Sequence, residues 1–141
     1  MIRPARLVAR PLQIALYGAL RANARVTELL GDRVYDHVPE PAEHPYLVIG
    51  EAVEVPDNTH DTFGRQADIT LHLWDKVDGY LRPTEVVDAL VELLDHQRDA
   101  LDIADHQVVS IRFLDARTLR APDPQLRHVP VRFRVNTQQE A

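Results

Sequence analysis

Histidine and acidic side chains are the groups in this chain that could bind a metal ion. There are seven histidines, and one of them, His60, lies between Asp57 and Asp61 in a polar segment. The segment lacks the repeated aspartates, the glycine and the distal glutamate of an EF-hand, and no two histidines have the His-Glu-x-x-His spacing that puts both on one helical face. We therefore interpret the histidines as surface residues and predict no metal and no cofactor. A small metal-dependent enzyme built on these three residues stays open as an alternative.

Groups for nucleophilic catalysis are scarce. The chain has no cysteine, and its single serine, Ser110, lies in an apolar segment without the Gly-x-Ser-x-Gly elbow of serine hydrolases. The five glycines are scattered, so the chain has no glycine-rich loop for phosphate groups. The sequence therefore predicts a protein that is not an enzyme.

Charge is distributed unevenly along the chain. The 16 basic residues and 22 acidic residues give a net charge of −6, the opposite of the balance that favours binding to nucleic-acid phosphates. The last third of the chain concentrates arginines, namely Arg112, Arg117, Arg120, Arg127, Arg132 and Arg134. Most acidic residues lie in earlier segments, which favours head-to-tail pairing of a basic hairpin with the acidic flank of another copy. Contacts of this kind form rings when the rotation between copies closes.

Length and hydropathy limit the architecture. The 141 residues correspond to a single domain, residues 1–141, and no segment has the ~18–20 consecutive apolar residues of a membrane span. Arginines followed by the apolar segment 12–20 have the order of a secretory signal. Gln13 and Tyr17 interrupt that segment, which favours an amphipathic helix. We expect a soluble protein made inside a cell.

Apolar residues at helical spacing predict helices over residues 11–23, near 26–30 and over Tyr80–Gln97. Pro83 is compatible with the last helix only in its first turn. Four other segments alternate apolar and polar residues as strands do. Their predicted apolar faces are, in chain order, Leu47, Ile49, Val53 and Val55; Ala67, Ile69, Leu71 and Leu73; Val109, Ile111 and Phe113; and Val129, Val131, Phe133 and Val135. Residues 35–45 are interpreted as a proline-rich loop and Asn136–Ala141 as a frayed polar tail.

These elements predict an α+β fold, a mainly antiparallel four-stranded sheet with two main helices packed on one face. The other face of the sheet then mixes apolar, aromatic and arginine side chains, a composition typical of protein interfaces. The candidate subunit-interface residues are Trp74, Arg112, Leu114, Arg132 and Arg134. An ordinary solvated sheet face is the alternative.

Four segments together resemble a known family. They are residues 32–39 (DRVYDHVP), 44–51 (HPYLVIGE), 69–75 (ITLHLWD) and the closing 127–134 (RHVPVRFR). In this order they are similar to the tail completion proteins, or tail terminators, of long-tailed phages and gene transfer agents. Pro130 departs from the family's closing strand, and we expect an edge position or a bulge there.

The resemblance implies a structural protein with no catalytic residues. In the family, six copies form a ring on the head-proximal end of the tail tube. The ring stops tube polymerisation and joins the tube to the head connector. The implied partners are further copies of the chain, the tail tube protein and a head-completion (stopper) protein. DNA passes through the ring without sequence-specific binding, no membrane is involved, and the particle is assembled in the host cytoplasm.

The polar segment between the first two predicted strands is the candidate for contact with the tube or the bore of such a ring. The residues concerned are Asp57, Asn58, Thr59, His60, Asp61 and Thr62. An ordinary surface loop is the alternative interpretation. A head–neck connector (adaptor) protein is the alternative function.

Overall fold

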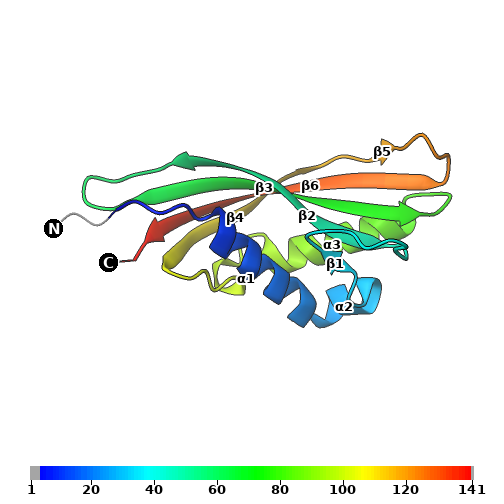
Figure 1. The fold of residues 1–141 in the computed structure, drawn as a ribbon, viewed down its shortest axis with the longest axis horizontal. Coiled ribbons are helices and arrows are strands. Elements are labelled where there is room, and N and C mark those ends of the chain that lie inside the picture. Colours follow the sequence, from blue (N-terminus) through cyan, green and yellow to red (C-terminus); the bar gives the residue numbers. More distant parts are fainter. Residues whose placement is uncertain (1–3, 141) are drawn as a thin grey trace.

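The chain folds around one six-stranded sheet (Figure 1). The structure is a computed structural model that describes residues 4–140. Its strands are β1 (Val34–Tyr35), β2 (Tyr46–Pro56), β3 (Gly64–Lys76), β4 (His106–Ala116), β5 (Leu119–Arg120) and β6 (Leu126–Gln139). The order is β1-β2-β3-β6-β4, and β5 pairs with β6 beyond the end of β4. The α+β class is confirmed, but the prediction of four strands was incomplete. The two missed strands, β1 and β5, have two residues each, too few to show a period.

Three helices lie together on one side of this sheet (Figure 1). They are α1 (Ala9–Ala22), α2 (Ala24–Leu30) and α3 (Leu81–Leu94), and a 3-10 turn η1 (Arg98–Ala100) follows α3. The core forms between helices and sheet, and its helical side includes Leu12, Leu16, Leu20, Val86, Leu90 and Leu94. No helix within residues 4–140 is both long and apolar enough to cross a membrane.

The third helix is shorter than predicted. It ends at Leu94 rather than Gln97, because the next two residues leave the helical conformation. The Asp95 carboxylate accepts a hydrogen bond from the Phe113 N–H of β4 (2.9 Å), and His96 turns the chain with φ 61°. Pro83 lies in the first turn of α3, as predicted. The short helix near 26–30 begins earlier, at Ala24, because the Asn23 side chain accepts a hydrogen bond from Val26 N–H and caps it (3.0 Å).

A bulge in β2 overturns one predicted strand face. The pairing with β3 shifts between Ile49 and Ala52, so the extra residue turns the remainder of β2 over. Leu47 and Ile49 are buried as predicted, whereas Val53 and Val55 lie on the other side, 64% and 41% exposed.

Bulges in β4 have the same effect. The pairing of β4 with β6 shifts between Val108 and Ser110 and again between Phe113 and Asp115. Val108 therefore packs against the core, whereas Val109, which was predicted to do so, is 47% exposed. Simple alternation fails wherever one strand carries an extra residue.

The closing strand runs further than predicted. Residues 136–139 continue β6, paired with β3 on one side and β4 on the other, so the expected frayed tail was wrong up to Gln139, and Ala141 lies outside the described residues. Ladder hydrogen bonds on both sides hold these polar residues in the sheet. Pro130 also lies in this central strand rather than at an edge. It is tolerated opposite the interruption between β4 and β5, where Arg117 N–H donates to its carbonyl (3.1 Å).

One carboxylate on β2 fixes the start of α1. The Glu54 oxygens accept hydrogen bonds from the N–H groups of Val8 (2.9 Å) and Ala9 (3.0 Å), and one of them also accepts from Arg65 Nε (2.7 Å). A negative charge at a helix N-terminus satisfies free N–H groups and interacts favourably with the helix dipole. The bulge in β2 turns Glu54 toward the helices, so the cap of α1 depends on that bulge.

A second carboxylate fixes the start of α3. Asp75 of β3 is fully buried and accepts two hydrogen bonds from the Arg82 guanidinium, at 2.7 and 2.5 Å. The Arg82 side chain is 45% exposed. The two partners are therefore unequal, since only the arginine can reach water if the other is removed.

We predict an asymmetric response to breaking this pair. Arg82→Met strands a buried carboxylate and should lower the free energy of unfolding by about 3 kcal/mol. Asp75→Asn leaves an arginine that can be hydrated and should cost only about 1 kcal/mol. Urea unfolding of both variants measures the difference. Arg25→Met, which breaks an exposed ion pair with Glu92, is the matched control and should cost no more than about 1 kcal/mol. Equal losses for Arg82→Met and Asp75→Asn would contradict the argument.

Candidate assembly surfaces

The sheet has a second face that none of the three helices covers (Figure 1). We call it the open face. It carries the residues of β3 and β6 that alternate with the core residues, so the prediction of one covered and one uncovered face is confirmed for these two strands. Its polar side chains are organised by cross-strand pairing into a histidine-containing row and a set of arginine–aspartate pairs.

Four side chains from three strands form the row, which we call the histidine row: Glu51, His72, His128 and Trp74. The rings of Trp74 and His128 stack with centroids 3.9 Å apart and planes 4° apart. His72 Nδ1 lies 2.7 Å from His128 Nε2, and His72 Nε2 lies 3.0 Å from a Glu51 oxygen. Gly50 makes room for this arrangement, because a Cβ there would lie 2.5 Å from the His72 ring. The row is therefore built on the β2 bulge.

Burial and neighbouring charge alter protonation in the row. Burial lowers the pKa of His128, and the adjacent His72 lowers it further. The hydrogen bond from His72 lowers the pKa of Glu51. A hydrogen bond between two ring nitrogens needs one unprotonated acceptor, so the His72–His128 contact cannot survive with both rings protonated.

Two arginines of β6 are held by aspartates of neighbouring strands. Arg132 donates to both oxygens of Asp115 (3.0 and 2.5 Å), and Arg134 donates to both oxygens of Asp68 (2.8 and 3.0 Å). These hydrogen bonds lower the pKa of each aspartate. The bidentate geometry fixes both guanidinium groups on the open face.

The structure brings the predicted interface residues to one sheet but does not leave all of them free. Arg132 and Arg134 are paired within the chain, Trp74 is stacked on His128, and Arg112 donates to the carbonyl of Ile111 (3.1 Å). Leu114 lies at a bulge of β4 and is half-buried. Their role at a subunit interface stays a prediction, and the basic hairpin carries less unbalanced charge than its sequence indicates.

The predicted alternation of β3, with Leu71 and Leu73 on the covered face, puts His72 on the open face, but it does not reveal the row to which His72 belongs. Alternation from Val129 puts His128 on the same face as His72, which was an available signal. The contact itself depends on the register, in which Trp74 lies opposite His128 and His72 opposite Pro130. No local pattern specifies that register.

The predicted contact loop joins β2 to β3 at the end of the sheet where β6 finishes (Figure 1). It is closed by a backbone hydrogen bond from Asp57 N–H to Gly64 O (2.8 Å) and by Gly64 N–H donating to Asn58 Oδ1 (3.1 Å). Inside it, the Thr59 and Thr62 hydroxyl groups share a hydrogen bond, and His60 and Asp61 are exposed. Among residues 4–140 no group of three or more histidine and acidic side chains is arranged to hold a metal ion. The loop is thus an ordered, polar projection.

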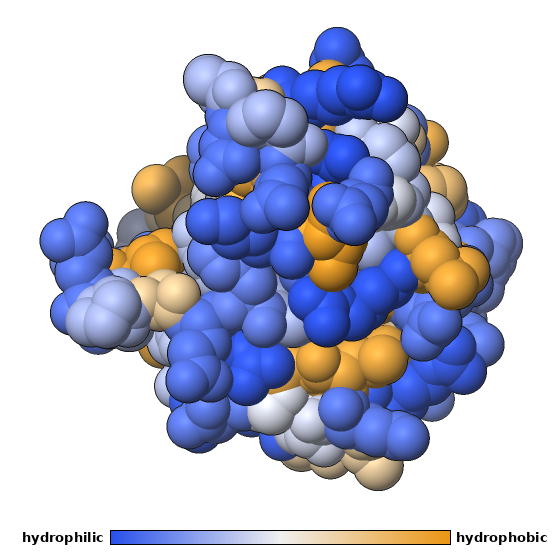
Figure 2. All heavy atoms as spheres, turned by 90° about the vertical axis from the view of Figure 1, so that its right-hand side faces the viewer, coloured by the Kyte–Doolittle hydropathy of each residue, from blue (hydrophilic) through white to orange (hydrophobic). Residues whose placement is uncertain are grey.

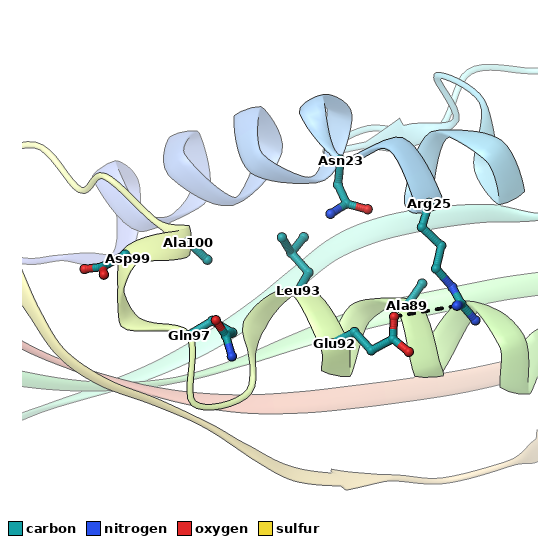
Figure 3. Close-up of a pocket in the computed structure, with 8 residues that line it drawn as sticks. All are labelled: Asn23, Arg25, Ala89, Glu92, Leu93, Gln97, Asp99 and Ala100. Atoms are coloured by element: carbon teal, nitrogen blue, oxygen red, sulfur yellow. Dashed lines mark ion pairs between the residues drawn. The ribbon is translucent and has the colours of Figure 1, made fainter.

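The opposite end of the sheet carries the β5–β6 turn, and Figure 2 views the molecule from that side. Apolar side chains appear there as separate patches among polar ones. A polar groove lies on the helix-covered side, where Arg25 of α2 and Glu92 of α3 form an ion pair of 3.6 Å across it (Figure 3). None of the predicted site residues lines this groove.

Comparison with known proteins finds a matching family model and solved structures with the same fold. The family model described as tail completion protein gp17 matches residues 14–138. A chain from the virion of a native gene transfer agent particle has the same fold, with a TM-score of 0.86 and 24% sequence identity over 95% of this chain and 99% of that chain. No curated protein matches the chain.

The histidine row predicts a pH-dependent stability. Since the pKa of His128 is lower in the folded chain than its ordinary value of about 6.5, the unfolded chain binds more protons below that pH. Wild-type stability should therefore fall as the pH drops below about 6.5. His128→Asn should be less stable at pH 7.5 but show a flatter decline to pH 5.5. Urea midpoints across this range measure both slopes, and parallel declines would argue against the assignment.

Proposed function

Because the chain belongs to the tail completion protein gp17 family, we propose that it is a tail terminator of a phage-type particle. The family gives the chain a structural role in a tail, as the sequence resemblance predicted. The finer proposal is that copies of the chain, six in number, form a ring on the head-proximal end of the tail tube. The ring stops tube polymerisation and joins the tube to the head-completion protein.

The observation that carries this proposal is the extent of the family match. Residues 14–138 include most of α1 and nearly all of β6, so the match covers the whole layered architecture rather than one motif. The resemblance noted in the sequence lies in four segments spread across the same range. The particle-derived structure with the same fold supports the proposal at the level of the fold alone.

Charge is consistent with a ring around DNA. Six copies at −6 each carry a formal charge of about −36. Acidic side chains facing the bore would repel phosphate groups, so DNA would pass without adhering. The exposed loop at residues 57–63, with Asp57 and Asp61, is our candidate for an element that reaches the bore or the tube.

The proposed ring and its place are tested by imaging. Negative-stain and cryo-electron microscopy of the purified chain, alone and mixed with isolated tail tubes, should show rings and tubes capped at one end. If the density of the chain lies on the head side of the neck instead, the chain is a head–neck connector. Chain that stays monomeric in both samples, at low and high salt, would overturn the proposal.

The loop has a separable role that we can predict. Replacing residues 58–63 by an Asn-Gly turn shortens the hairpin without touching the core. The variant should form rings of wild-type mass but fail to cap tubes, so that overlong tails accumulate and the yield of infectious particles falls at least ten-fold. A loop of full length with Asp61→Asn tests charge alone. Unchanged particle yield from the shortened loop would exclude the role.

A further inference from the structure

The outer side of α1 carries an unpartnered stripe. Arg10, Ile14, Tyr17 and Arg21 follow one another at helical spacing, and all four are exposed, Ile14 by 63% and Tyr17 by 40%. Arg21 covers part of the Tyr17 ring and donates to its hydroxyl (2.6 Å). We call these four residues the α1 stripe: two apolar side chains between two positive charges, about 16 Å from end to end.

Gly18 lies beside this stripe, and no contact within residues 4–140 explains a glycine there. A Cβ at this position would meet no atom within 4 Å, so the fold does not need glycine there. Glycine in the interior of a helix is destabilising relative to alanine. Its usual benefit is the close approach of another backbone. The open space at Gly18 leaves room for the backbone of another copy.

The free part of β2 carries a complementary stripe. After the bulge, Glu51, Val53 and Val55 alternate on the open face, and Asp57 continues the ladder through its N–H bond to Gly64. We call these four residues the β2 stripe: two exposed valines between two carboxylates, about 20 Å long. In the described part of the chain the strand edge beyond Val48 is also free, because β1 pairs only with Leu47 and Val48. Glu51 is held by His72 but keeps 66% of its side chain exposed.

We propose that the α1 stripe of one copy binds the β2 stripe of the next. Arginines at both ends of one stripe meet carboxylates at both ends of the other, and the apolar pairs meet in the middle. A second copy is the occupant because this chain presents both halves. Helix α1 lies on the helical side of the sheet (Figure 1), whereas the valines of the β2 stripe are exposed on the open face, so one molecule cannot bring its own two stripes together. The contact is heterologous, because the two copies contribute different surfaces. Such contacts form a ring if the rotation from one copy to the next returns to the first copy.

This inference rests on the proposed ring and locates its contact. It differs from the pairing expected from the sequence, in which the basic hairpin meets an acidic flank. Arg132 and Arg134 of that hairpin already have bidentate partners. Arg10 and Arg21 have no carboxylate partner in the described part of the chain, so their charge is available to a neighbour.

Crosslinking between two single-cysteine variants tests the contact. The chain has no cysteine of its own, so Ile14→Cys and Val53→Cys each place one thiol, at exposed sites that leave the core intact. With a short bis-maleimide, the mixture should give covalent dimers joining the two variants. The Ile14→Cys/Val53→Cys double variant should give a ladder ending at the number of copies in the ring. Val53→Cys mixed with Leu81→Cys, 78% exposed at the start of α3, is the matched control and should give at least ten-fold less dimer.

Gly18 provides a second, independent readout. Gly18→Leu fills space that is open in the single chain, so it should fold normally but prevent crosslinking and ring formation. Gly18→Ala should raise the melting temperature and retain at least part of the assembly. Circular dichroism and sedimentation velocity separate folding from association. A Gly18→Leu variant that assembles like wild type would overturn the close-approach argument.

The outcomes distinguish this inference from the proposed function. Wild-type rings without crosslinks between positions 14 and 53 would leave the ring standing and reject this interface. Single chains without crosslinks, with and without tail tubes, would reject both. Crosslinks equal to those of the Leu81→Cys control would also reject the interface, because they would report random collision.

Discussion

At Gly50 the backbone has no side chain, and the His72 ring of the neighbouring strand occupies the space where one would be. The bulge at this point adds one residue to β2, and the consequences extend along the whole strand. Beyond it, Glu54 points toward the helices and caps α1, whereas Val53 and Val55 point away from the core. Any side chain at position 50 would have to displace His72 or move β2. The docking of α1 and the composition of the open face therefore depend on one tight backbone approach.

Some charged side chains of the molecule are held by partners within the chain, and others are available to a neighbouring molecule. Asp75 and Glu54 are satisfied by groups at helix starts, so they secure the helical layer to the sheet. Arg132 and Arg134 are satisfied across strands, so they secure the open face. A guanidinium that already has a bidentate carboxylate gains little from another one. Association is better served by charges that the fold leaves unbalanced, and Arg10 and Arg21 of α1 are two of these.

The overall form suits a protein that acts through surfaces. The helical layer covers the middle of the sheet, and hairpins extend from it at both ends (Figure 1). One copy thereby offers a helix face, a strand edge, an open sheet face and two projecting turns to different neighbours. In a ring built this way, each copy would touch two others laterally and keep its ends for the structures above and below. The binding energy would then be spread over many weak contacts. A function of this kind needs no compact sequence motif.

The sequence by itself determined the α+β class, the helical layer on one side and the buried faces of β3 and β6. These features follow from periods of 3.6 and 2 residues, which each segment carries within itself. It also determined the family, because four separated segments carry that likeness in order. Only the tertiary structure decided the faces of Val53, Val55 and Val109, since bulges arise from pairing between strands. The histidine row and the arginine–aspartate pairs were decided in the same way. Their members lie 17 to 66 positions apart in the chain, and register brings them together through contacts that no local period encodes.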